Sequence, residues 1–102
     1  MGGAMHARVS FYQLGEGVDA DAAVKSFGDS AGVVEQMDGQ RGLMLLIDRD
    51  SGKAITLTFW DTEEHLRSSA EQASQIRRQA ADAGGLTIEG VENYEVAMES
   101  GR

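Results

Sequence analysis

The sequence predicts a single α+β domain of β-α-β-β-α-β order, in which a four-stranded antiparallel sheet carries both helices on one face. Three observations predict this class. The chain has 102 residues, of which 41% are apolar, and that is enough for one modest core and not for two. Segments with strand periodicity alternate with segments of helical spacing, and one short polar turn joins two apolar runs.

The first strand and the first helix are distinguished by their hydrophobic period. Within residues 6–14, Ala7, Val9 and Phe11 alternate with Arg8, Ser10 and Tyr12, which is typical of a strand. After the glycines of 15–17 the apolar residues change to helical spacing over 19–37. The residues with this spacing are Val24, Phe27, Ala31 and Val34.

Two local features qualify this first helix. Asp19 or Asp21 is expected to cap its start, because a carboxylate there accepts from free backbone N–H groups. Gly28 and Gly32 each weaken a helix by up to about 1 kcal/mol relative to alanine. We therefore expect a kink or a break near them.

A hairpin occupies the middle of the chain. Residues 39–42 form a turn, and the continuous apolar run 43–47 is typical of a strand buried on both faces. The polar residues 48–52 have turn chemistry, and alternation returns over 53–60. Two strands joined by so short a loop form an antiparallel hairpin.

The last third of the chain predicts a helix followed by a strand. Asp61 and Glu64 have the spacing of a capping box, so the helix is expected to begin there and to run to Ala83. Gly84-Gly85 ends it. A long strand is expected over 86–98, with a bulge or bend at Gly90.

The predicted order is that of a ferredoxin-like split β-α-β unit. Both helices would then cover one face of the sheet, whereas the first and third strands carry apolar side chains on both faces. An uncovered apolar face predicts association, most simply as a homodimer about a two-fold axis.

Charge and composition limit the classes of binding partner and cofactor that the chain is expected to have. The net charge of −8 and the scattered nine Lys and Arg residues do not suit nucleic acid or an anionic membrane surface. Without cysteine, disulfides and thiolate metal sites are excluded, and we expect no metal, no cofactor and a cytoplasmic location. The domain is expected to span 5–98, with disordered ends at 1–4 and 99–102.

Residues 55–66, ITLTFWDTEEHL, end a strand in tryptophan and begin an acidic helix at once, and 39–43 start the second strand as GQRGL. With the strand order and the chain length, these segments resemble the antibiotic-biosynthesis-monooxygenase-like (ABM) family of the dimeric α+β barrel superfamily. The resemblance covers roughly residues 6–98. It implies a dimeric α+β barrel with a pocket between sheet and helices, and Trp60 at the pocket wall.

The family includes cofactor-independent monooxygenases of phenolic or quinol-type substrates and haem-degrading enzymes. The haem-degrading branch has an asparagine on the first strand and a histidine nine or ten residues after the tryptophan. Here the first strand has no asparagine, and Ser69 and Ala70 stand at that spacing, which argues against haem degradation. An asparagine four residues before the tryptophan in some monooxygenases is here Thr56.

The candidate site combines residues of the first and third strands with one histidine. Arg8, Ser10 and Tyr12 share one face of the first strand, and Thr56, Thr58 and Trp60 share one face of the third. If these faces meet the helices, Arg8 suits an oxyanion, and the aromatic and hydroxyl groups suit a ring; if they meet a partner subunit, they are interface residues. His65 is the candidate base near neutral pH.

Two functions follow from these residues. The first is a cofactor-independent monooxygenase for a small aromatic substrate, in which Arg8 or His65 stabilises or generates the substrate anion while Trp60 and Tyr12 pack its ring. The second is a non-catalytic module of the same fold that binds a small ligand or serves in assembly. The missing asparagine and the lack of a committed acid–base pair favour the second.

Overall fold

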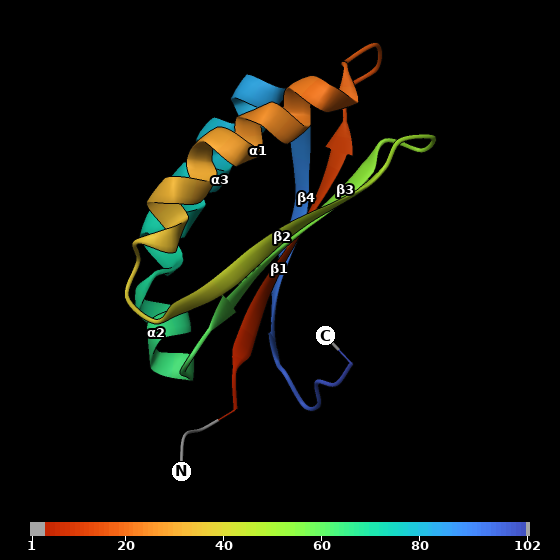
Figure 1. Ribbon diagram of the computed structural model, residues 1–102. Coiled ribbons are helices and arrows are strands. Elements are labelled where there is room, and N and C mark those ends of the chain that lie inside the picture. The colour runs from red at the N-terminus through yellow and green to blue at the C-terminus, as the bar shows by residue number, and fades with distance from the viewer. Residues whose placement is uncertain (1–3, 102) are drawn as a thin grey trace.

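The computed structural model describes residues 4–101 and has the predicted β-α-β-β-α-β order. Four strands form one sheet in the order β2-β3-β1-β4, and all neighbouring strands are antiparallel. Figure 1 shows both long helices on one face of this sheet. The elements are β1 (His6–Leu14), α1 (Ala20–Glu35), β2 (Gln40–Asp48), β3 (Lys53–Trp60), α2 (Glu63–Ser68), α3 (Ala70–Gly84) and β4 (Leu86–Glu95). The predicted ferredoxin-like fold class is confirmed.

The register of the two central strands decides which side chains face the helices. Ser10 of β1 pairs with Thr56 of β3, and Tyr12 pairs with Ala54. Because side chains alternate along a strand, the even-numbered residues of both strands lie under the helices and the odd-numbered ones lie on the opposite face. The predicted bulge near Gly90 is present, since the β1–β4 register shifts between Phe11 and Tyr12.

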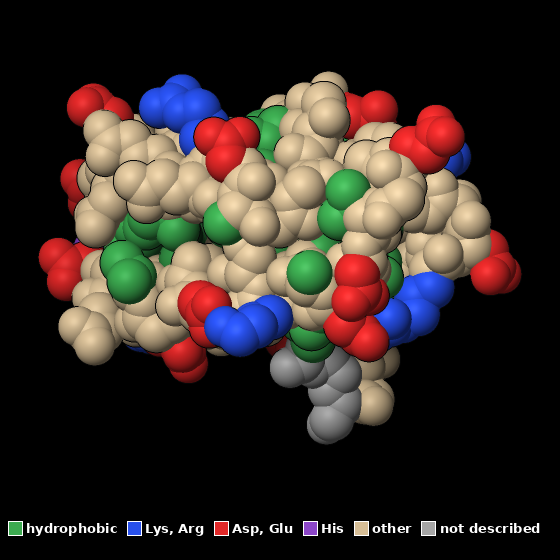
Figure 2. All heavy atoms as spheres, turned by 90° about the horizontal axis from the view of Figure 1, so that it is seen from above, with side chains coloured by type: hydrophobic (Ala, Val, Ile, Leu, Met, Phe, Trp, Pro, Cys, Tyr) green, Lys and Arg blue, Asp and Glu red, His purple; other side chains and the backbone are tan. Residues whose placement is uncertain are grey.

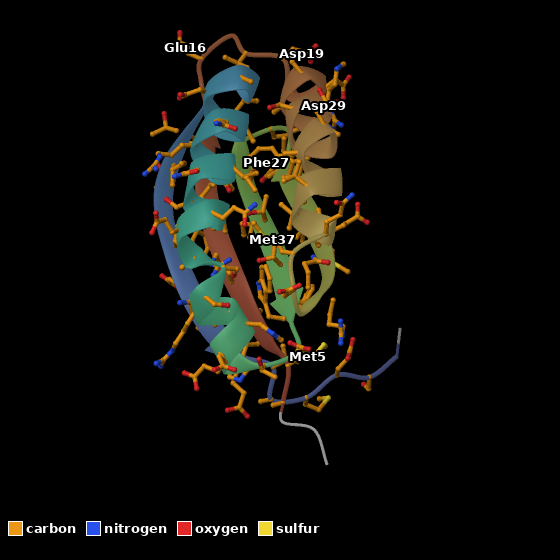
Figure 3. All side chains as sticks on the ribbon, turned by 90° about the vertical axis from the view of Figure 1, so that its left-hand side faces the viewer. Met5, Glu16, Asp19, Phe27, Asp29 and Met37 are labelled. Atoms are coloured by element: carbon orange, nitrogen blue, oxygen red, sulfur yellow. The ribbon has the colours of Figure 1, made fainter. Side chains whose placement is uncertain are left out.

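The helix α1 is anchored by its inner side chains. Asp19 caps it by accepting from the backbone N–H of Asp21, as expected. Ala23 and Phe27 are its buried residues, and Figure 3 shows Phe27 between the two long helices. Of the kink or break expected near its two glycines, the break is absent, since α1 is continuous over Ala20–Glu35.

The predicted second helix is divided in two at Ser69. Thr62, and not Asp61, caps α2, and its side chain accepts from the N–H of His65. The hydroxyl of Ser69 donates to the carbonyl of Leu66, so the chain turns there before α3 begins. Helix α3 ends as predicted, with Gly85 in the left-handed region at its C-cap.

The second strand departs from its prediction. Strand β2 is an edge strand, and Met44 and Leu46 are 41% and 48% exposed on the face that the helices do not cover. Burial on both faces is therefore wrong for the single chain. The same face carries the half-buried apolar side chains Val9, Phe11, Ile55, Leu57 and Phe59.

The chain ends lie beside each other outside the sheet. Strand β4 stops at Glu95, earlier than predicted, and the backbone N–H of Val96 donates to the carbonyl of Met5. Residues 96–101 have no regular secondary structure. The expectation of disorder at 1–3 and 102 lies outside the described residues, and the domain bounds 5–98 stay a prediction.

The surface is predominantly polar and acidic at the end that Figure 2 shows, where Asp and Glu side chains surround small apolar patches. No helix in residues 4–101 is long and apolar enough to cross a membrane. Within the same residues, no three or more His, Asp or Glu side chains gather as metal ligands would.

A cavity between sheet and helices

A cavity of about 70 Å³ lies between the sheet and the helical layer. All six strand residues of the predicted site line it: Arg8, Ser10, Tyr12, Thr56, Thr58 and Trp60. The remaining lining residues are Phe27, Ser30, Ala31, Val34, Leu43, Leu45, Ala73, Ile76, Arg77 and Ala80. The polar faces of β1 and β3 therefore face the helices of the same chain.

Arg8 is the most unusual lining residue, because it is a cation with only 4% of its surface exposed. Its Nη2 donates to the carbonyl of Leu66 at 2.5 Å and to the hydroxyl of Ser69 at 3.2 Å. No described protein group accepts from its Nη1, which is also buried. Burial, and secondly the charge of Arg77, lower the pKa of Arg8 to about 10, so it is still charged at neutral pH.

Trp60 forms a fixed wall of the cavity. Its side chain is fully buried, and its Nε1 donates to the hydroxyl of Thr58 at 3.0 Å. The guanidinium of Arg8 lies over the indole, 5.4 Å from the ring centroid. An arginine over an aromatic face is a favourable cation–π arrangement, which partly offsets the cost of burying that charge.

Tyr12 makes two contacts at the cavity, one through its hydroxyl group and one through its ring. Its hydroxyl lies 3.1 Å from that of Thr56, and its ring meets Phe27 edge to face at 5.1 Å between centroids. The position where some monooxygenases of the resembled family have an asparagine thus carries a threonine already engaged with a tyrosine.

Sequence reasoning missed Arg77 and the helical side of the cavity. Arg77 is half-buried on α3, and burial lowers its pKa while the neighbouring Tyr12 hydroxyl opposes that effect. A signal existed in the chain. Arg77 stands four residues after Ala73 and three before Ala80, a spacing that places the three residues on one face of a helix.

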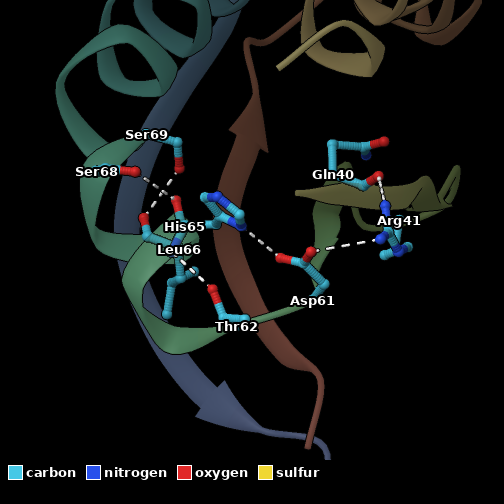
Figure 4. A network of polar contacts seen from close by, with 8 residues as sticks. All are labelled: Gln40, Arg41, Asp61, Thr62, His65, Leu66, Ser68 and Ser69. Atoms are coloured by element: carbon cyan, nitrogen blue, oxygen red, sulfur yellow. Dashed lines mark hydrogen bonds and ion pairs between the residues drawn. The ribbon is translucent and has the colours of Figure 1, made fainter. Parts of the chain in front are cut away.

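His65 is the predicted site residue that the structure does not bring to the cavity. It lies on α2, where its Nδ1 is 2.6 Å from Oδ1 of Asp61, and Arg41 of β2 contacts the other oxygen of that carboxylate at 3.3 Å (Figure 4). This polar network links β2 to the start of α2 at one end of the sheet.

The same network shifts the pKa values of His65 and Asp61. The hydrogen bond to Asp61 raises the pKa of His65 above its ordinary value of 6.5. That hydrogen bond also lowers the pKa of Asp61 below 3.8. Both groups are partly exposed, so the pair is a surface contact and not a buried dyad.

The cavity therefore has mainly apolar walls and several hydroxyl groups, and arginine is the only charged residue type among its described lining residues. None of the described lining residues is Asp or Glu. Such a site can hold a small molecule and stabilise negative charge on it. A porphyrin does not fit these residues, because no histidine lines the cavity and its volume is about 70 Å³.

Comparison with known proteins identifies relatives in sequence and in fold. The chain matches no protein family in a scan of family profiles. It is 41% identical over 64 residues to the uncharacterized protein Rv2557 of Mycobacterium tuberculosis, and 40% identical over 58 residues to Rv2558 of the same organism. These matches cover 63% and 55% of this chain. They span only 28% and 25% of the length of the relatives.

Solved structures match over nearly the full chain. SnoaB, a cofactor-independent oxygenase from Streptomyces nogalater, is 15% identical with a TM-score of 0.72, over 96% of this chain and 97% of SnoaB. A MhuD variant with two manganese protoporphyrin IX molecules per active site is 20% identical with a TM-score of 0.73, over 95% of this chain and 99% of its own.

A Bordetella bronchiseptica protein, provisionally assigned as an antibiotic biosynthesis monooxygenase, is 12% identical with a TM-score of 0.72, over 94% of this chain and all of its own. At these identities the likeness shows the fold. The chain has the fold of the ABM-type proteins.

Proposed function

We propose that this chain, which has an ABM-type fold, is a cofactor-independent monooxygenase of a small phenolic or quinol-type compound bound in the cavity. One observation carries the proposal. The guanidinium of Arg8 is buried, its Nη1 has no acceptor among the described groups, and Arg8 lines an apolar cavity that no described carboxylate lines. Such a group stabilises the phenolate that must form before a phenol can reduce oxygen without a cofactor.

This reaction requires few groups from the protein. The ionised phenol supplies all four electrons that reduce O2. One oxygen atom replaces the hydrogen of a ring C–H as a carbonyl oxygen, the other leaves as water with the hydrogens of that C–H and of the phenol O–H, and the product is a quinone. The protein contributes a dry cavity, a cation for the anion and a fixed ring surface. Arg8 supplies the cation, and Trp60 and Tyr12 supply the surface.

The direct test is oxygen consumption by the purified protein with a panel of hydroquinones and polyphenols, without added metal, flavin or haem. Saturable consumption above the spontaneous rate, with one water formed per oxygen incorporated, is the expected result. The proposal fails if no member of the panel is bound or turned over.

Tyr12→Phe separates a cavity reaction from surface oxidation. It removes the hydroxyl that meets Thr56, so we expect turnover to fall by about tenfold, the size of one lost hydrogen bond to a developing charge. Tyr94→Phe is the matched control, because Tyr94 lies 52% exposed on the opposite face of the sheet. Equal rates in both variants would contradict a reaction in the cavity.

A non-catalytic ligand-binding module is the second candidate, and the cavity volume favours it. About 70 Å³ is roughly half of the engineered cavity of about 150 Å³ that holds benzene, so a ring enters only if the walls move. Suppose that a small ligand binds and that the protein consumes no oxygen with any phenol of the panel. That result would favour the ligand-binding module over the monooxygenase.

We further propose that the protein is a homodimer joined through the face of the sheet that the helices leave bare. Met44, Leu46 and Tyr94 are exposed there, beside half-buried residues of β1 and β3. Burial of such a patch is worth about 25 cal/mol per Å² of apolar surface, which is the driving force for pairing.

A further inference from the structure

The two arginines of the cavity differ from the cations on the surface. Lys25, Arg41, Arg49 and Arg67 each lie within 3.3 Å of an Asp or Glu oxygen. The chain has 17 acidic residues and 9 Lys and Arg residues, so carboxylates are in excess. The buried Arg8 nevertheless has no carboxylate partner among the described residues, and neither Asp nor Glu reaches the cavity.

The hydrogen bonds of Arg8 leave one direction open. Its Nη2 is used by the Leu66 carbonyl and the Ser69 hydroxyl, which fixes the guanidinium in place. Its Nη1 is the buried atom without an acceptor. A charged donor left unsatisfied in a low-dielectric site is strongly unfavourable, so an acceptor is expected at that position when the site is in use.

Arg77 brings a second positive charge to the same cavity from the opposite layer. It stands on α3, above the sheet that carries Arg8, and its charge makes the Arg8 cation less favourable. Two like charges drawn into an apolar cavity repel each other unless an anion neutralises them. The hydroxyl groups of Tyr12 and Thr56 add uncharged hydrogen-bonding capacity beside them.

We infer that Arg8 and Arg77 form one anion-binding subsite, and that the ligand of the cavity is a small organic oxyanion whose charged oxygen lies between the two guanidinium groups. The apolar part of the ligand then packs against Phe27, Val34 and Leu45. The inference deepens the proposed function, since it rests on the same cavity, but it concerns charge and not turnover.

Acetate and acetamide test the subsite, because they have the same shape and differ in charge. Both are titrated into the full-length, ¹⁵N-labelled protein while the side-chain Nε–H resonances of Arg8 and Arg77 are followed. We expect acetate to bind at least about tenfold more tightly than acetamide. Arg77→Gln is expected to weaken acetate by about tenfold, and Arg78→Gln, its exposed neighbour on α3, is expected to leave it unchanged.

Three outcomes separate this inference from the proposed function. Equal affinity for acetate and acetamide, or equal loss in Arg77→Gln and Arg78→Gln, overturns the subsite whether or not hydroquinone binds. Tight acetate binding without any hydroquinone binding supports the subsite and removes the phenolic substrate. If Arg77→Gln does not fold, the acetate and acetamide affinities of the unmodified protein decide the question.

Discussion

At the scale of single residues, Arg8 contributes both to the packing of the fold and to the candidate site. Its Nη2 donates to the Leu66 carbonyl and so holds the end of α2, and its Nη1 is buried without an acceptor among the described groups. A cation is favourable at the C-terminal end of a helix, which gives the buried charge a structural reason. The unpaired nitrogen has no such reason, and that is why we assign it to ligand binding.

Replacing Arg8 by lysine separates these two roles. Lysine keeps the charge but has no planar fork, so it cannot serve both the Leu66 carbonyl and a ligand in the cavity. We expect Arg8→Lys to fold with a free energy of unfolding lower by about 1–3 kcal/mol and to lose anion binding. Denaturant unfolding and an acetate titration measure the two effects, and unchanged acetate affinity would show that Nη1 has no role in binding.

His65 gives a prediction about pH. Its pKa is raised by the hydrogen bond to Asp61, so its contribution to stability is complete below pH 6.5 and is lost as the pH rises through the raised value. The pKa of Asp61 is lowered, so its contribution is complete above pH 3.8 and is lost as the pH falls further.

An NMR titration of the imidazole measures the shift directly. Asp61→Asn should return the pKa of His65 toward 6.5, because it removes the hydrogen bond that raises it. A His65 pKa that does not move in Asp61→Asn would disprove the contact.

At the scale of elements, the turn before β2 is held against the start of α2. Gly39 has φ of 81°, and a Cβ there would meet the His65 ring and the Asp61 carboxylate. Its carbonyl accepts from the backbone N–H of Asp61 at 2.8 Å. This contact positions the β2–β3 pair next to α2.

Gly39→Ala should therefore destabilise the protein more than the same change at Gly17. Gly17 has φ of 75° but open space around it, so alanine there costs only the left-handed backbone penalty of about 1–2 kcal/mol. At Gly39 the collision with His65 and Asp61 adds to that cost. Thermal unfolding of the two variants compares them, and equal melting temperatures would show that the turn is not packed against α2.

The elements could be predicted to different degrees for physical reasons. Strands β1 and β3 have a clean period of two, and the sequence predicted their bounds and their polar faces. The break at Ser69 could not be predicted, because Arg8 donates to that hydroxyl from 61 residues away. Arg77 was missed because a charged residue next to an apolar helix stripe is usually exposed, as Arg78 is.

At the scale of the whole molecule, the two faces of the sheet have different roles. One face and the helices enclose the cavity, and the other is bare and apolar in the single chain. The cavity lies on the helix-covered face, so the proposed dimer would contact the sheet from the opposite side.

Leu46→Glu tests the proposed dimer. A charge at this 48% exposed position of the bare face should leave a folded monomer, because burying an unpaired carboxylate in an interface is costly. Val33→Glu places the same charge at a 52% exposed apolar position on α1 and should remain dimeric. Light scattering after size-exclusion chromatography gives the masses, and a monomeric unmodified protein would contradict the proposal.

The central claim is that the cavity binds a small phenolic ligand, and the fluorescence of Trp60 tests it most directly. Trp60 is the only tryptophan of the chain, is fully buried and forms a wall of the cavity, so its emission reports on that site. Titration with hydroquinone should change the emission saturably in the unmodified protein, with about tenfold weaker binding in Arg77→Gln. Emission that stays constant, or that declines linearly without saturation, would contradict the claim.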